Sequence, residues 1–104
     1  MSISKNKLSA AQAISEITGH LYFGDMVKSL RMCENVSQAE MARSIGISRQ
    51  YLCNIESSER KADVELAVKF AKFLKHPKEF FISRLLEDQL YTAGLDYTIT
   101  LKAS

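Results

Sequence analysis

The sequence is poor in the residues from which disulfide frameworks and metal sites are built. Its 104 residues include two cysteines, Cys33 and Cys53, which form no Cys-x-x-Cys pair. We therefore expect neither a zinc site nor a disulfide, as is typical of a reducing compartment. No run of apolar residues approaches the length of a membrane span, and the N-terminus lacks the apolar centre of a signal peptide. The composition thus predicts a cytoplasmic protein without a metal, a cofactor or a membrane partner.

An excess of charge of one sign is also missing. Fourteen Lys and Arg residues against twelve Asp and Glu residues give a net charge of +2, which does not by itself indicate a nucleic-acid partner. The common signatures of hydrolases, metalloproteases and phosphate-binding loops are absent from the chain, so we expect no enzyme. The single proline, the four glycines and the 46% of hydrophobic residues predict one compact domain.

Helical periodicity covers most of the chain. Apolar residues at spacings of three and four predict helices over about residues 9–18, 23–34, 37–44, 49–56, 64–74 and 78–91. Ser37 begins a Ser-x-x-Glu capping box, and Ser48 and Asp63 are N-cap candidates for the next two helices. Gly46 provides the left-handed residue at which the chain leaves a helix. Pro77 is expected to open the last helix at its first position.

The periodicity changes from 3.6 to 2 after Gly94. Strand-favouring and apolar residues alternate there: Tyr97, Thr98, Ile99, Thr100 and Leu101. A single strand cannot satisfy its own backbone hydrogen bonds, so we expect it to pair with the same strand of a second molecule and form a dimer. The alternative is a frayed polar tail.

The segment from Ser37 to Lys61 reads SQAEMARSIGISRQYLCNIESSERK. It resembles the helix-turn-helix of the phage-repressor or xenobiotic-response-element (Cro-type) family. The resemblance rests on the Ser-Gln opening of the first helix, Ala42 at the helix crossing, Gly46 in the turn and Glu56 at the end of the second helix. The apolar residues expected between the two helices are Met41, Ile45, Ile47, Leu52 and Ile55. With its flanking helices the resemblance covers about residues 23–80.

The second helix of this motif has a polar face with the chemistry that DNA reading requires. Such a helix lies in the major groove with its N-terminal residues against base edges. An Arg can bind guanine O6 and N7 together, and a Gln or Asn can bind adenine N6 and N7. We therefore expect Arg49, Gln50 and Asn54 to read bases. Tyr51 is a further candidate, packed on a thymine methyl group or on a sugar.

Other residues are candidates for binding the DNA backbone. The resemblance implies a phosphate contact for Gln38, at the start of the first helix, where exposed N–H groups and the helix dipole favour an anion. The further phosphate candidates are Arg43, Ser48, Arg60 and Lys61. Such contacts set affinity and register and carry no sequence information.

Two further positions bear on the structure of the motif. The resemblance implies a partly buried ion pair between Arg31 and Glu56, which ties the first family helix to the second helix of the motif. The chain departs from the family pattern at Ser57 and Ser58, where the family usually has Asn-Gly, so a longer or strained turn is expected there.

Taken together, these observations predict an all-α fold, a bundle of five to six helices with a repressor-like helix-turn-helix and a short C-terminal strand paired across a dimer. The expected organisation is an N-terminal helical extension over 1–20, a DNA-binding domain over 21–82, and a helix end with the dimerisation strand over 83–104. We expect a homodimeric repressor that binds double-stranded DNA at an inverted repeat. One alternative is an antitoxin that regulates its own operator and binds a toxin. Another is a protein-interaction module without DNA binding.

Overall fold

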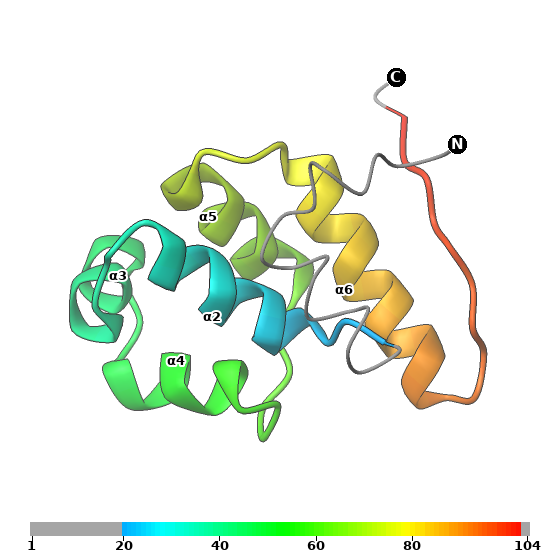
Figure 1. Ribbon diagram of the computed structural model, residues 1–104, viewed down its shortest axis with the longest axis horizontal. Coiled ribbons are helices and arrows are strands. Elements are labelled where there is room, and N and C mark those ends of the chain that lie inside the picture. The colour runs from blue at the N-terminus through cyan, green and yellow to red at the C-terminus, as the bar shows by residue number, and fades with distance from the viewer. Residues whose placement is uncertain (1–19, 103–104) are drawn as a thin grey trace.

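The computed structural model describes residues 20–102, and this part of the chain is helical with irregular connections (Figure 1). Its helices are α2 (Phe23–Cys33), α3 (Gln38–Ile45), α4 (Arg49–Glu56), α5 (Val64–Leu74) and α6 (Lys78–Thr92). The predicted all-helical fold is confirmed, and each of these helices begins and ends within about one residue of its predicted bounds. The helix predicted over about 9–18 lies outside the described residues.

Local side-chain chemistry fixes where these helices begin. The side chains of Ser37, Ser48 and Asp63 each accept a hydrogen bond from the backbone N–H three residues further on, at 2.8–3.0 Å. These caps satisfy donors that the first turn of a helix leaves without a partner. Gly46 takes the left-handed conformation, with φ 82°, and ends α3. Pro77 is the N-cap of α6 and not its first helical residue, because its ψ of 134° is still extended.

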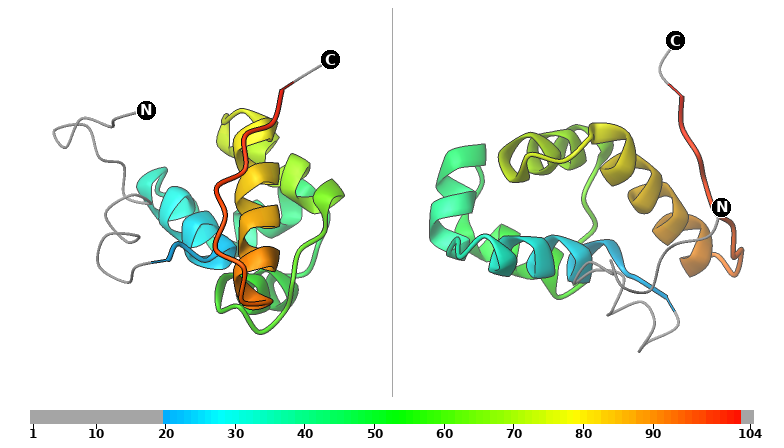
Figure 2. Two further views of the ribbon diagram at one scale, coloured as in Figure 1. Left: turned by 90° about the vertical axis from the view of Figure 1, so that its right-hand side faces the viewer. Right: turned by 45° about the horizontal axis from the view of Figure 1, so that its top comes forward.

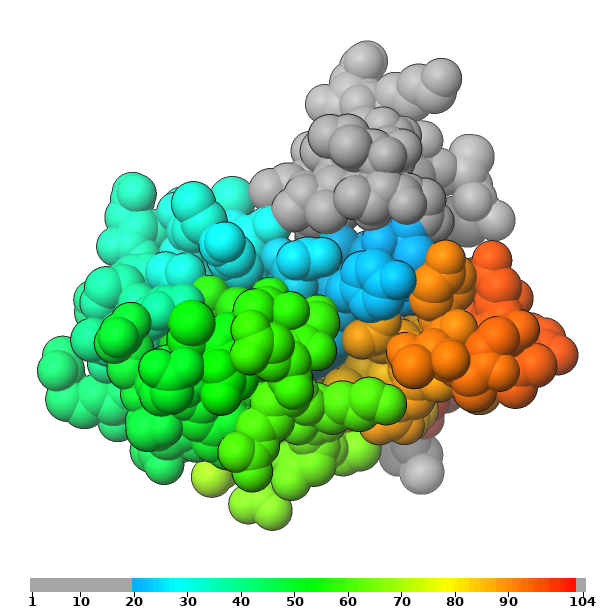
Figure 3. Space-filling view, turned by 90° about the horizontal axis from the view of Figure 1, so that it is seen from below, coloured from blue at the N-terminus to red at the C-terminus, as the bar shows by residue number. Residues whose placement is uncertain are grey.

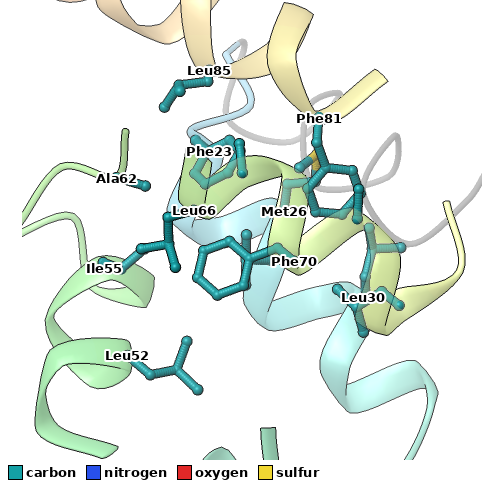
Figure 4. Close-up of a cluster of buried hydrophobic side chains, with 14 of the residues drawn as sticks. Phe23, Met26, Leu30, Leu52, Ile55, Ala62, Leu66, Phe70, Phe81 and Leu85 are labelled. Atoms are coloured by element: carbon teal, nitrogen blue, oxygen red, sulfur yellow. The ribbon is translucent and has the colours of Figure 1, made fainter. Parts of the chain in front are cut away.

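The core lies between α2, α3, α4, α5 and α6, and Figure 4 shows some of its side chains pointing toward one another. Its largest fully buried members are Phe70, Phe81, Met26, Met41, Leu52, Ile55 and Val27. Full burial of one such side chain contributes about 1.5–3 kcal/mol. The core therefore packs against one side of α4 and holds the helix in place.

The chain after α6 does not form the predicted strand. Residues 95–102 are irregular and run back along α6, as both Figure 1 and Figure 2 show. The backbone N–H of Ile99 donates to the Glu87 carboxylate at 2.7 Å, and that of Leu95 donates to the Leu90 carbonyl at 2.8 Å. The prediction of a strand over Tyr97, Thr98, Ile99, Thr100 and Leu101 is wrong for the single chain, because the segment finds a hydrogen-bond acceptor on its own α6. Pairing of these residues across a dimer consequently has no support from the fold.

Candidate nucleic-acid interface

Helices α3 and α4 are joined by a short turn that sets their crossing. The backbone N–H groups of Gly46 and Ile47 both donate to the Ala42 carbonyl, at 2.9 and 3.0 Å. The side chain of Ala42 is 2% exposed, and its small size lets the two helices approach closely. Leu52 and Ile55 anchor the inner side of α4 in the core, which leaves its opposite side toward solvent. Helix α4 lies at the lower edge of the molecule in Figure 1, and its solvent-facing side is part of the face that Figure 3 shows.

The outer side of α4 carries the predicted base readers. Arg49 and Gln50 are exposed and Asn54 is half-buried. The Gln50 side-chain amide donates to the Asn54 Oδ1 atom at 2.9 Å, so these two amides are held side by side one turn apart. Each amide still has a free donor or acceptor, since a side-chain amide offers two N–H groups and a carbonyl oxygen. This surface can therefore form hydrogen bonds with base edges.

A buried ion pair supports this surface from within. Arg31 on α2 donates through Nε to Glu56 Oε2 at 2.7 Å and through Nη2 to Glu56 Oε1 at 3.0 Å. The Arg31 Nη1 atom donates to the Val36 carbonyl at 2.7 Å, so all three guanidinium nitrogens have partners. The side chains are 9% and 2% exposed, and the structure thus places Arg31 and Glu56 together in the core.

Gln38 connects this ion pair to Arg49. The Gln38 Nε2 atom donates to Glu56 Oε1 at 2.9 Å, and Gln38 Oε1 accepts from Arg49 Nη1 at 3.3 Å. The chain of contacts runs from the buried Arg31 through Glu56 and Gln38 to the exposed Arg49. Glu56 thus orients the Gln38 amide directly, and the Gln38 amide in turn contacts Arg49.

The remaining phosphate candidates differ in their surroundings. Arg43, Arg60 and Lys61 are exposed, and within residues 20–102 none of them forms an ion pair. Their charges are therefore not neutralised by the described part of the chain. Ser48 is the N-cap of α4, where its hydroxyl oxygen accepts from the Tyr51 N–H.

The turn after α4 is strained at Ser58. Its φ of 66° is left-handed, a conformation that an L-residue other than glycine adopts at a cost of about 1–2 kcal/mol. The backbone N–H groups of Glu59 and Arg60 both donate to the Asn54 carbonyl, at 2.9 and 3.1 Å, which holds the turn in this conformation. The expected strained turn is therefore present at the position where the family usually has glycine.

The Ser58→Gly substitution is expected to stabilise the protein. Glycine adopts the left-handed conformation without steric cost, although it also raises the conformational entropy of the unfolded chain. We expect the net free energy of unfolding to rise by about 1 kcal/mol, which raises Tm by roughly 4 °C. Thermal unfolding followed by circular dichroism measures it. Ser57→Gly is the matched control, because Ser57 has an ordinary φ of −88° and glycine there should only destabilise. Equal destabilisation by both substitutions would contradict the strain.

Sequence reasoning missed two features of this region. A Cβ atom at Gly24 would overlap the carbonyl oxygen of Ile55, so this glycine permits α2 to lie against the end of α4. A glycine inside an amphipathic helix is a signal that could have revealed such an approach. The second feature is the guanidinium of Arg60, which lies over the Tyr51 ring at 4.7 Å from its centroid. No local pattern indicates that contact.

Neither a metal centre nor a membrane helix is found in the part of the chain that the structure describes. Residues 20–102 contain no cluster of three His, Cys, Asp or Glu side chains that could hold a metal ion. None of the described helices is long and apolar enough to cross a membrane. Cys33 is exposed and Cys53 is half-buried, and both are free thiols.

The fold is similar to those of helix-turn-helix proteins of known structure. One is PA4674 of Pseudomonas aeruginosa, crystallised in complex with its 18-bp operator DNA, with a TM-score of 0.64 and 20% identity over 71% of this chain and 81% of that one. Another is an HTH_3 family transcriptional regulator from Vibrio cholerae, with a TM-score of 0.53 and 24% identity. The match covers 68% of this chain but only 39% of that longer one. No curated protein matches the sequence.

The sequence itself also matches a model of a protein family. The HTH_3 helix-turn-helix model matches residues 27–80, which is just over half of the chain. The match extends from α2 to the first turn of α6 and includes the whole of α3 and α4. The resemblance noted in the sequence is confirmed, and the chain belongs to the helix-turn-helix family.

Proposed function

We propose that the protein is a sequence-specific DNA-binding transcriptional regulator that inserts α4 into the major groove. The observation that carries this proposal is the polar side of α4, where Arg49 and Gln50 are exposed and Asn54 is half-buried. A helix with this chemistry fits a groove about 12 Å wide and offers bidentate partners for guanine and adenine. We assign Arg49, Gln50 and Asn54 to base reading.

Backbone contacts would set the orientation of α4 in the groove. Gln38 is the first residue of α3, close to N–H groups that helix geometry leaves available to an anion, and Glu56 fixes its amide. Arg43, Arg60 and Lys61 are unneutralised by the described residues and supply positive charge for phosphates. The modest net charge of +2 is compatible with this role, since the charges needed are local.

We propose further that two chains bind an inverted repeat and repress transcription by excluding polymerase from a promoter. The dimensions of the chain support pairing on adjacent half-sites. Its Cα extents are 36 × 31 × 30 Å, and half-sites one helical turn apart are separated by about 34–36 Å. A chain of this size is small enough for two copies to occupy adjacent half-sites on one side of the duplex. PA4674, whose fold is similar, was crystallised in complex with its 18-bp operator DNA.

Selection of binding sites from random duplex DNA tests this function. The purified full chain is used at near-physiological salt, because protein–DNA affinities depend steeply on ionic strength. We expect enrichment of one inverted repeat with half-site centres about 10–10.5 bp apart. Failure to enrich any sequence would contradict the proposal and favour a protein-binding role, for which the toxin-binding alternative then provides a candidate partner.

A further inference from the structure

The contact between Tyr51 and Arg60 joins the second helix of the motif to the turn that follows it. The Arg60 Cζ atom lies over the Tyr51 ring at 4.7 Å from the centroid, within the range of a cation–π interaction. From this contact we infer that Tyr51 is a positioning residue, which holds Arg60 against the side of α4 so that its guanidinium binds a backbone phosphate. The inference rests on the proposed function and assigns Tyr51 a role other than base reading.

The surroundings of Tyr51 fit a ring that supports the Arg60 guanidinium better than a side chain that reads bases. Its side chain is half-buried and packs against the hydrophobic core, whereas Arg49 and Gln50 are exposed. A ring fixed on one side by the core has its other side available for a cation. The Tyr51 backbone N–H is also engaged by the Ser48 cap at 3.0 Å, so the residue is held at both its backbone and its ring.

The turn after α4 limits where Arg60 can reach. Its backbone N–H donates to the Asn54 carbonyl at 3.1 Å, which places the residue beside the end of the helix. From there the side chain extends back along α4 to Tyr51, nine positions earlier in the sequence. Within residues 20–102 the guanidinium forms no ion pair, so its charge is available to a ligand. A guanidinium that lies over a ring keeps N–H donors at its edge, and these match the oxygens of a phosphate.

Helical geometry places Tyr51 and the Arg60 side chain on the opposite flank of α4 from Gln38. Residues of an α-helix are separated by about 100° around its axis. Glu56 follows Arg49 by seven residues and therefore projects within about 20° of it, and Gln38 contacts both of these side chains. Tyr51 follows Arg49 by two residues, or about 200°, and so projects from the other flank. A helix in the major groove faces a phosphodiester strand on each flank, and Gln38 and Arg60 are placed to contact one strand each.

The inference is tested by measuring the DNA affinity of substituted proteins. The duplexes are the selected operator and versions of it with single base-pair changes. Tyr51→Leu keeps an apolar side chain against the core and removes the aromatic ring, and Arg60→Ala removes the charge. We expect each to weaken binding about three- to tenfold for all sequences alike, and Arg60→Ala to lower the salt slope by about one per chain. The double variant should bind no more weakly than Arg60→Ala alone, because both changes remove one contact. Tyr51→Phe should recover most of the loss, and Lys78→Ala, at the far end of α6, is the charge-matched control.

Nuclear magnetic resonance of the free protein tests the stack without DNA. The Arg60 Hδ protons should be shifted upfield by the ring of Tyr51, and this shift should persist in Tyr51→Phe and disappear in Tyr51→Leu. Additive losses for Tyr51→Leu and Arg60→Ala, or a changed base preference in Tyr51→Leu, would overturn the inference while the proposed function stands. A wild-type protein that binds no duplex would overturn the proposed function, and the phosphate contact with it.

Discussion

Replacement of Glu56 with alanine is expected to lower the free energy of unfolding by about 3–5 kcal/mol. Glu56 is 3% exposed and accepts hydrogen bonds from Arg31 Nε, Arg31 Nη2 and Gln38 Nε2. Its removal leaves the guanidinium of Arg31 buried with only the Val36 carbonyl as a partner. Because domains of this size are stable by about 5–15 kcal/mol in total, the loss removes a large part of the stability. Urea unfolding measures it.

The exposed ion pair on α5 provides a matched control. The Glu65 Oε1 atom lies 3.8 Å from Lys69 Nζ, and the side chains of Glu65 and Lys69 are 82% and 51% exposed. Surface pairs at this spacing contribute about 0.3–0.5 kcal/mol, so Glu65→Ala should have little effect. Similar losses for Glu56→Ala and Glu65→Ala would contradict the structural role assigned to the buried pair.

A double substitution separates the stability of the ion pair from its role in DNA binding. Arg31→Met combined with Glu56→Leu replaces both charges with apolar side chains of similar size, so much of the lost stability should return. Gln38, however, loses the carboxylate that orients its amide. We therefore expect a folded protein with weakened DNA binding, and full affinity in this variant would contradict the role of Glu56 in orienting Gln38.

Much of the fold follows from short stretches of sequence. Ser37, Ser48 and Asp63 cap their helices through hydrogen bonds that span three residues, and Gly46 ends α3 through its own backbone preference. Such interactions are local, so the sequence shows them directly. The helix-turn-helix was predictable for the same reason, because its caps, turn and small crossing residue all lie within one segment.

The features that were missed depend on contacts between residues that belong to different helices or turns. The segment over 97–101 has the composition of a strand, but Glu87 on α6 accepts the Ile99 N–H and the segment stays irregular. Strand composition describes how well side chains fit a sheet and does not supply a partner. A strained turn was expected at Ser58, but the stack of Arg60 on Tyr51 depends on how that turn directs the Arg60 side chain, which no local pattern indicates.

The Arg49→Ala substitution tests the central claim, that the outer side of α4 reads bases. Arg49 is exposed, and its Nη1 atom donates a 3.3 Å hydrogen bond to Gln38 Oε1, so loss of the side chain should leave the fold intact. A bidentate contact with guanine contributes about 1–3 kcal/mol of discrimination, or about 2–6 kcal/mol over two half-sites. We expect that loss to be confined to one base pair per half-site.

The most direct measurement is the affinity of wild type, Arg49→Ala and Lys78→Ala for the selected operator and for every single base-pair change in one half-site. The account predicts that Arg49→Ala becomes indifferent to one position and keeps its preferences at all others, while Lys78→Ala retains the wild-type pattern. A uniform loss at every position, or an unchanged pattern in Arg49→Ala, would contradict base reading by α4.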